Sequence, residues 1–455
     1  MVKKTSVKAP MTKDLLMKYT FVALAVLAAI SCLSFGFDSL MITIVAVLVA
    51  VVCDYLLSMI MGEKGPLNTW SAAVFGLIVA LSYSYGMAPA MATEEFSILG
   101  GAGIDKFLYP AIISALGLIV FKKVQGLAGR KYVNPAAIAK LIVIGLVLAP
   151  SFALIPADHT AIDFTNQPIP NPWVAGEFLQ PMSAQIFGST MISCYGDPNL
   201  DPMNPYTYGS YDNPTPDVLF TMLVQKYHGW IGGVSSIAVI VVGIALFAIL
   251  REYIKWRITV TYFVTTILFS LIAGFIYGGD PLFRLVFHLF TGSSIFLAFF
   301  MATDPATTPL THSGQNIFGV GLGLLTMIIQ MYTGFLGGSV LALVIMNLTC
   351  PILDNVGTPK AIAKRTCNVK LRKAKTFADV KTTTCIRCGA CLYACSNCIP
   401  TVSVKEAVDK GDWSRVEKLG AGYCQQCGSC AYVCPARINL KAIMLSAREK
   451  VGANN

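Results

Sequence analysis

Apolar residues fill most of the first 355 positions in stretches of roughly 20, the length at which one helix crosses a hydrocarbon core about 30 Å thick. Polar residues gather in the segments between these stretches. The pattern predicts ten membrane-spanning helices in an all-α polytopic protein. They lie near residues 19–36, 39–61, 68–88, 106–122, 134–154, 232–250, 257–278, 283–302, 316–333 and 335–354.

The polar segments divide the chain into regions. We predict a cytoplasmic N-terminus (1–18), a transmembrane domain (19–355) with a long extracytoplasmic loop (151–231), a basic cytoplasmic linker (356–380) and a small domain (381–455). Overall the chain is 55% hydrophobic and only 13% charged, about half the charged share of an ordinary soluble domain.

A secretory signal peptide is the alternative for the N-terminus, because five lysines precede the first apolar stretch. However, a second long apolar run follows almost at once, with no convincing cleavage site between the two. An uncleaved first helix fits better.

The charges are distributed unevenly between the two predicted sides. Lysine and arginine cluster at Lys64, 122–131 and 251–257, all on the side that holds both termini. Residues 151–225, on the opposite side, contain seven acids and no lysine or arginine. Positive-inside topology therefore places both termini in the cytoplasm of a bacterial or archaeal cell. The net charge of +10 reflects this asymmetry, and we reject nucleic acid as a partner.

Two Asn/Asp-Pro segments suggest that the membrane region consists of two related halves. Asn134-Pro135-Ala136 opens the fifth span and Asp304-Pro305-Ala306 follows the eighth. Broken segments of this kind commonly frame an ion or ligand site, although ordinary turns at helix ends explain them too. Lys140, inside the fifth span, is expected to extend to the cytoplasmic face.

The linker after the last span is strongly basic, with eight lysines and arginines between Lys360 and Lys381 and a single acid, Asp379. Such a segment binds anionic lipid headgroups. It would equally suit an acidic ferredoxin, and the two interpretations are compatible.

Nine of the fourteen cysteines lie beyond residue 380, in two runs with the spacing Cys-x2-Cys-x2-Cys-x3-Cys. In this spacing the first three thiolates bind one [4Fe–4S] cluster and the fourth binds the other cluster. The runs therefore predict two clusters. The ligands of one are Cys385, Cys388, Cys391 and Cys434, and those of the other are Cys424, Cys427, Cys430 and Cys395.

Two alternatives concern these cysteines. Structural zinc fits poorly, because zinc sites use four ligands in two pairs. The first run also departs from the usual pattern, since Ser396 rather than proline follows Cys395, and Cys398 comes shortly afterwards. Cys398 could replace Cys395 as a ligand or be a spare thiol.

The motifs of the membrane region resemble one family. Gly-Asp-Pro-Leu-Phe at 279–283, His-Leu-Phe-Thr-Gly at 288–292 and Ala-Phe-Phe-Met-Ala-Thr-Asp-Pro at 298–305 are similar to the D subunit of Rnf electron-transport complexes and to the B subunit of Na⁺-translocating NADH:quinone reductase. Separately, the cysteine runs resemble the two-cluster ferredoxin module of the Rnf C subunit. The chain thus looks like a fusion of the two.

The resemblance implies FMN, which D-type subunits carry on a threonine of a Ser-Gly-Ala-Thr-Pro-like motif between spans five and six. Here Thr215 lies in Asp-Asn-Pro-Thr-Pro and Thr190 in Gly-Ser-Thr, so neither motif is complete. The flavin could be bound to either threonine, held without a covalent bond, or absent. Asp304, in the Asp-Pro turn, is the best other candidate for a flavin contact.

These features together predict a membrane subunit of an Rnf-like enzyme complex. It would relay electrons between ferredoxin- or NAD-linked partners and membrane flavin, coupled to Na⁺ or H⁺ transport, with other Rnf-like subunits, a low-potential carrier and membrane lipid as partners. A non-pumping membrane polyferredoxin that carries electrons from quinol is the main alternative. A channel with a cluster sensor is a third. No paired carboxylates or nucleophile suggest bond-making catalysis.

Overall fold

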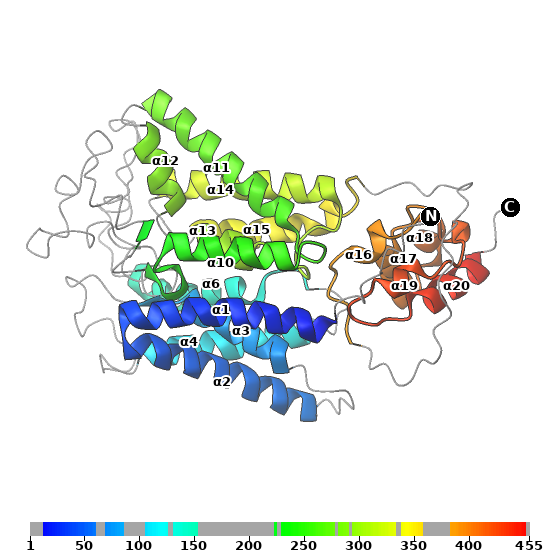
Figure 1. Ribbon diagram of the computed structural model, residues 1–455, viewed down its shortest axis with the longest axis horizontal. Coiled ribbons are helices and arrows are strands. Elements are labelled where there is room, and N and C mark those ends of the chain that lie inside the picture. The colour runs from blue at the N-terminus through cyan, green and yellow to red at the C-terminus, as the bar shows by residue number, and fades with distance from the viewer. Residues whose placement is uncertain are drawn as a thin grey trace, which may run out of the picture.

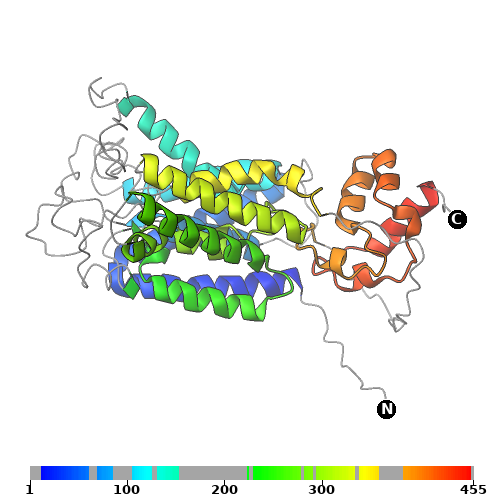
Figure 2. The same ribbon diagram turned by 90° about the horizontal axis from the view of Figure 1, so that it is seen from above.

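The structure is a computed structural model that describes residues 12–60, 69–85, 105–125, 131–152, 223–224, 229–277, 281–290, 294–333, 338–357 and 383–451. These residues form a long helical bundle and, at one end of it, a smaller helical domain (Figures 1 and 2). We call the smaller part, residues 383–451, the cysteine domain. Thr190, Thr215 and most of the predicted linker lie outside the described residues.

The bundle contains helices from both predicted halves. Nine of the ten predicted spans overlap one helical segment each, whereas the eighth, 283–302, overlaps two, residues 281–290 and 294–301. The first half comprises α1 (Lys13–Phe35), α2 (Phe37–Ile60), α3 (Thr69–Leu81), α4 (Asp105–Leu116) with its π-helical continuation η3 (Gly117–Val124), and α6 (Pro135–Phe152). The second half comprises α10 (Ser236–Ile249), α11 (Trp256–Tyr277), α12 (Pro281–Phe290), α13 (Ser294–Phe296) continued by the π-helix η7 (Leu297–Met301), α14 (His312–Thr333) and α15 (Gly338–Leu353).

A single residue, Gly36, connects the first two helices. Its φ of +75° is a conformation that glycine adopts without a clash, and its N–H caps α1 by donating to the Cys32 carbonyl. At the other end of α1 the Thr12 hydroxyl accepts from the Leu15 N–H at 3.3 Å. Both ends of α1 are therefore defined by local capping, and α2 returns directly through the bundle.

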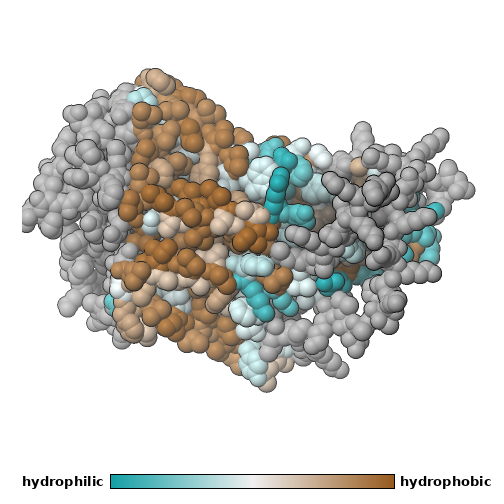
Figure 3. Space-filling model, viewed as in Figure 1, coloured by the Kyte–Doolittle hydropathy of each residue, from teal (hydrophilic) through white to brown (hydrophobic). Residues whose placement is uncertain are grey.

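The bundle surface is apolar where it would meet lipid. A continuous hydrophobic band covers the visible face of the bundle, and polar surface appears where the cysteine domain begins (Figure 3). Leu33, Ile60 and Phe275, on helices of the bundle, are each at least 79% exposed. Within the described residues, four helices are long and apolar enough to cross a membrane, and three apolar helices are shorter. An apolar surface of this extent is typical of a protein surrounded by lipid or by other membrane subunits.

Two of the shorter helices meet inside the bundle. Helices α3 and α10 have 13 and 14 residues, a rise of about 20 Å against the roughly 30 Å of a hydrocarbon core. Beyond α3, the strand β1 (Ser84–Tyr85) pairs antiparallel with β2 (Gly229–Trp230), and a 3-10 turn, η6 (Ile231–Gly233), leads into α10. The prediction of a helix through residue 88 is therefore wrong from 82 to 85. Non-helical backbone at this depth requires protein cover, and Trp230 is 2% exposed.

The expectation for Lys140 is also wrong. Its side chain is completely buried, and its ammonium donates to the Ser82 carbonyl and hydroxyl instead of extending to the end of the bundle. The reason is that α6 begins inside the bundle: a Cβ at Gly117 would lie 3.0 Å from the Pro135 carbonyl oxygen. The segment before α6 is held there by Asn134, whose amide donates to the Met301 carbonyl at 3.1 Å.

The cysteine domain has short helices around a small core. They are α16 (Ala390–Tyr393), α17 (Thr401–Asp409), α18 (Trp413–Lys418), η8 (Ala421–Tyr423), α19 (Ser429–Tyr432) and α20 (Leu440–Val451). Val404, Val416 and Ala421 are completely buried between them. Among these helices α16 lies nearest the bundle and α20 far from it (Figure 1).

Candidate metal centres at the end of the bundle

The two cysteine runs fold as copies of each other. In each run the residue two positions after the first cysteine adopts positive φ, as does the glycine two positions further on. These residues are Arg387 (53°) and Gly389 (81°) in the first run, and Gln426 (58°) and Gly428 (76°) in the second. Corresponding residues of the two runs are 39 positions apart. The glycines cap α16 and α19, so each loop turns tightly and starts a helix that carries its third cysteine. The left-handed backbone directs several cysteine side chains of one run toward a common space.

Two cavities result, and each is lined by cysteines of both runs. Around the first, which we call the bundle-side cavity, lie Cys385, Cys388, Cys391 and Cys434. Around the second, the outer cavity, lie Cys395, Cys424, Cys427 and Cys430. The structure thus brings together both predicted groups of four, including the exchange of the fourth cysteine between runs. Cys398 is not among the residues that line either cavity.

The backbone supports the cysteine sulfurs. The Arg387 N–H donates to Cys385 Sγ and the Ile399 N–H to Cys395 Sγ, both at 3.4 Å. Burial raises the pKa of Cys388 to about 11 and that of Cys430 to about 12, and raises the pKa of Cys391 as well. These thiols are therefore protonated without a metal, and binding a cluster requires them to release their protons.

The cavities suit a cluster better than a single ion. Within the described residues, no three side chains of histidine, cysteine, aspartate or glutamate converge closely enough to hold one metal ion. Zinc would require four sulfurs at about 2.3 Å from a common centre. In each cavity four cysteines surround a common space and one of their sulfurs accepts a backbone N–H, which is the donor set that a [4Fe–4S] cube requires.

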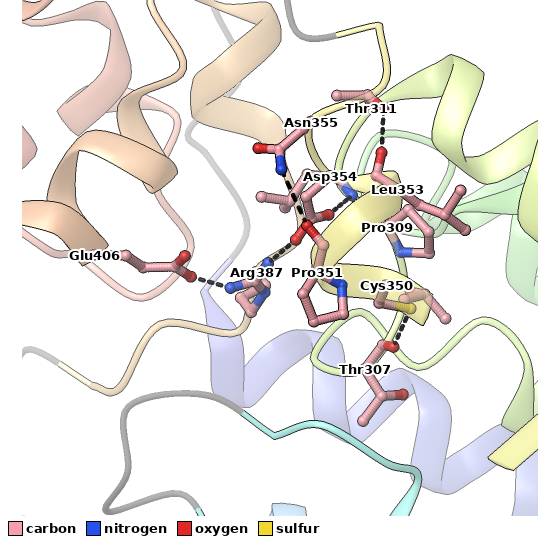
Figure 4. A network of polar contacts seen from close by, with 12 residues as sticks. Thr307, Pro309, Thr311, Cys350, Pro351, Leu353, Asp354, Asn355, Arg387 and Glu406 are labelled. Atoms are coloured by element: carbon pink, nitrogen blue, oxygen red, sulfur yellow. Dashed lines mark hydrogen bonds and ion pairs between the residues drawn. The ribbon is translucent and has the colours of Figure 1, made fainter. Parts of the chain in front are cut away.

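A buried ion pair connects the bundle-side cavity to the bundle. Arg387, which lines that cavity, lies 2.8 Å from a carboxylate oxygen of Asp354, just beyond the end of α15. Its other nitrogen pairs with Glu406 of α17 (Figure 4). The second oxygen of Asp354 accepts from the Leu310 N–H at 2.8 Å. One carboxylate therefore joins the end of α15, the loop before α14 and the first cysteine loop.

Aromatic and apolar contacts also hold the cysteine domain against the bundle. The rings of Tyr393 and His312 stack with their centroids 4.1 Å apart, and the Tyr393 hydroxyl donates to the Leu310 carbonyl at 2.8 Å. Ile386, from the first cysteine loop, packs into the hydrophobic core of the bundle, and Cys388 packs against that core. Leu310, from the bundle, packs in return into the core of the cysteine domain. The two parts thus exchange apolar side chains as well as charges.

The start of α1 lies at the same junction. The Lys13 N–H donates to the Pro435 carbonyl at 2.9 Å, and its ammonium donates to the Thr384 hydroxyl at 3.3 Å. The cysteine domain is therefore in contact with the first helix of the bundle as well as with the last two.

Residues 1–98 and 105–363 of the chain match the NQR2, RnfD, RnfE family, well over half of its length. The chain belongs to this family. The match ends before the cysteine runs, so membership concerns the bundle alone, and the predicted relationship of the bundle is confirmed. A polytopic membrane protein follows from membership together with the apolar bundle surface.

Several relatives are similar to the bundle, two of them over most of its length. The D subunit of the Na⁺-translocating ferredoxin:NAD⁺ oxidoreductase complex of Acetobacterium woodii is 27% identical over 341 residues, which cover 74% of this chain and 87% of the relative. The D subunit of the proton-translocating ferredoxin:NAD⁺ oxidoreductase complex of Clostridium ljungdahlii is 26% identical over 349 residues, covering 75% and 89%. The D subunit of the ion-translocating oxidoreductase complex of Methanosarcina acetivorans is 32% identical over 140 residues, covering 30% and 45%.

Asp304 lies within the family match, in a turn that it stabilises itself. One carboxylate oxygen accepts from the Ala306 N–H at 3.2 Å and the other from the Thr307 hydroxyl at 3.3 Å. The Asp-Pro motif therefore has a local structural role here. A contact between Asp304 and flavin stays a prediction, as does the attachment of FMN to Thr215 or Thr190, which lie outside the described residues.

Sequence reasoning missed the residues of the junction. Neither motif nor spacing gave Asp354, Arg387 or Tyr393 a role. No spacing rule connects a residue at the end of the family match with one inside a cysteine loop. The one available signal was the charge itself: Arg387 is an arginine inside an otherwise apolar ligand loop.

Proposed function

We propose that this chain is the D-type membrane component of an Rnf-like complex, with a ferredoxin-like extension that holds two [4Fe–4S] clusters and relays electrons between a soluble low-potential carrier and the bundle. By its family and its relatives it is a subunit of an ion-translocating ferredoxin:NAD⁺ oxidoreductase complex. The observation that carries the relay is the seating of the first cysteine loop in the bundle core through Ile386 and Cys388.

The order of the relay follows from this seating. Cys385, Cys388, Cys391 and Cys434 hold the cluster next to the bundle, and Cys395, Cys424, Cys427 and Cys430 hold the cluster that a soluble partner reaches. Bound clusters supply one-electron redox chemistry, while the protein fixes their position and tunes their potential. Arg387 and Asp354 keep the inner site against the bundle.

The membrane arrangement completes the proposal. Ten spans place both termini and the cysteine domain in the cytoplasm, the 151–231 loop on the opposite side, and the basic linker at the lipid headgroups or a docked acidic ferredoxin. FMN, held on Thr215 or Thr190 or without a covalent bond, would supply the electron acceptor in the bundle. Other Rnf-like subunits complete the path, and electron flow drives Na⁺ or H⁺ across the membrane.

The cofactor content of the purified protein tests this function. We expect about eight irons and as many acid-labile sulfides per chain, together with flavin. Acid precipitation then separates the forms of flavin: flavin that stays in the denatured pellet is covalently bound, and the Thr215→Ala and Thr190→Ala variants identify the residue. Eight irons without flavin in either fraction would contradict the D-type mechanism and support a non-pumping polyferredoxin. Zinc in place of iron would contradict the relay itself.

A further inference from the structure

Lys140 is an ionisable residue buried inside the bundle, and no acidic side chain among the described residues pairs with it. It is 0% exposed, and its ammonium donates to the carbonyl and the hydroxyl of Ser82, the residue after α3. The same ammonium lies 4.5 Å from the centroid of the Trp230 ring, on its face. Among the described residues no charged side chain interacts with it electrostatically.

The site lies deep in the bundle. Ser82 follows the 13 residues of α3, which rise about 20 Å from the end of the bundle where that helix starts. Trp230 belongs to the strand β2, which pairs with β1 where α3 ends and α10 has not yet begun. The ammonium is therefore held between two interrupted helices, and the partially negative C-terminal end of α3 faces it.

A structural role alone explains these contacts incompletely. Capping the free carbonyls at the end of α3 is useful, but a neutral donor achieves the same result without burying a charge. An ionisable residue at membrane depth is costly and is a functional candidate by default. Unwound segments and the C-terminal ends of half-helices are the elements that bind monovalent cations in transporters. Here the end of α3 and the segment before α10 bind the ammonium group of Lys140 instead of a free ion.

We propose that the Ser82 oxygens and the Trp230 ring form a binding site for one monovalent positive charge, and that Lys140 fills or vacates this site by exchanging its proton during ion transport. This inference rests on the proposed function, because it names the residue through which electron flow moves an ion. The occupant is either the proton on Lys140 or a small cation such as Na⁺.

The exchange is balanced in charge and atoms. One N–H bond of the ammonium breaks, the proton leaves, and Lys140 becomes a neutral amine. With H⁺ as the coupling ion, that proton is the transported charge, and a proton taken up later restores the ammonium. With Na⁺, the cation binds the Ser82 oxygens while the amine is neutral and leaves when Lys140 is protonated again. The site carries one positive charge at most, which avoids two like charges in a medium of low dielectric.

Arginine at position 140 separates the structural role from the transport role. The Lys140→Arg variant keeps a positive charge and hydrogen-bond donors for Ser82, but a guanidinium does not lose its proton in proteins. Lys140→Met removes the charge altogether. Lys122→Met is the matched control, because Lys122 also donates to a serine carbonyl of α3 (Ser71, 2.6 Å) and lies over an aromatic ring (Phe75, 5.4 Å), but near the other end of that helix.

The experiment uses the whole complex in sealed proteoliposomes. Reduced ferredoxin and NAD⁺ start the reaction, NADH reports electron transfer, and ²²Na⁺ uptake or a pH-sensitive dye reports transport. With an uncoupler present, we expect Lys140→Arg and Lys140→Met to form NADH. Without it, we expect ion uptake per NADH to fall to background in both variants and to be unchanged in Lys122→Met. Loss of ²²Na⁺ uptake identifies Na⁺ as the occupant, and loss of the dye signal alone identifies the proton.

Uptake per NADH in Lys140→Arg equal to that of the unmodified complex would overturn the inference. A wild-type complex that transports neither ion would instead overturn the proposed function. If neither variant at position 140 assembles, Ser82→Ala provides the test, since it keeps the lysine and removes only its hydroxyl partner. We then expect the pH at which uptake is half-maximal to shift while NADH formation is unchanged; an unshifted profile would count against the site.

Discussion

Arg387 and Asp354 form an ion pair at 2.8 Å across the boundary between the cysteine domain and the bundle, and both side chains are nearly buried. The arginine lines the bundle-side cavity with positive φ, and the aspartate directly follows the last helix of the bundle. The pair therefore joins the inner cluster site directly to the end of the membrane region. The junction is therefore a defined interface between the two parts of the chain.

The first prediction concerns this pair. Asp354→Ala leaves the Arg387 charge with Glu406 alone and removes the acceptor of the Leu310 N–H. Removing one partner of a buried pair costs about 3–5 kcal/mol, so the junction should open. We expect faster hydrogen exchange at the Leu310 amide and in 383–393, and slower electron transfer from the cysteine domain to membrane flavin.

The control for that experiment is the exposed pair between Lys405 and Asp409. Asp409→Ala removes a pair worth about 0.3–0.5 kcal/mol and should leave exchange at the junction unchanged. Equal protection of Leu310 in the Asp354→Ala protein and the unmodified protein would show that the pair does not hold the junction.

The second prediction distinguishes Cys395 from Cys398. Only Cys395 lines the outer cavity, so Cys395→Ser should reduce the iron content by about one [4Fe–4S] cluster per chain. Cys398→Ser should leave it unchanged. Iron and sulfide analysis, with electron paramagnetic resonance of the reduced protein, measures both variants. The reverse result would make Cys398 the ligand and require the loop after α16 to rearrange.

The third prediction is a pH dependence of the junction. Partial burial and the neighbouring Arg257 lower the pKa of His312, which precedes its predicted span and stacks on Tyr393. When the junction is open, His312 has a pKa of about 6.5, so as the pH falls it binds a proton before it does so in the closed junction. The stacking contribution is therefore complete above pH 6.5 and is lost as the pH falls through the lowered pKa.

His312→Phe keeps a stacked ring and removes the titration. Hydrogen exchange in 383–393, corrected for the intrinsic rate, should rise as the pH falls from 7.5 to 5.5 in the unmodified protein and stay flat in the variant. A parallel rise in both proteins would assign the pH dependence to another group.

The fourth prediction tests a second buried pair, inside the bundle. Asp54 is 3% exposed and lies 3.3 Å from the Lys123 ammonium, which also donates to the Ser58 hydroxyl at 2.9 Å. Asp54→Asn should destabilise the bundle, because it leaves a poorly solvated cation. The double variant Asp54→Asn/Lys123→Met should recover part of the loss, with a coupling energy of about 0.5–3 kcal/mol in a thermal unfolding cycle. Additive losses would mean that the two side chains do not interact.

The sequence alone determined the features that depend on local pattern and spacing. Apolar runs of a membrane's thickness predicted helices that the structure contains, because each such helix satisfies its own backbone hydrogen bonds. The cysteine spacing predicted which four sulfurs lie together, and the structure gathers the same two groups, because short loops permit few arrangements.

The tertiary structure decided what depends on contacts between distant segments. Whether α3 ends at Leu81 or continues is determined by β2, more than 140 residues later in the chain, which pairs with β1. Lys140 was predicted at the cytoplasmic face because its position in the fifth span is near the start. Since Asn134 holds the beginning of α6 inside the bundle, Lys140 is instead completely buried there. How deeply a residue lies in a bundle depends on how the helices pack, so its position along one helix does not determine it.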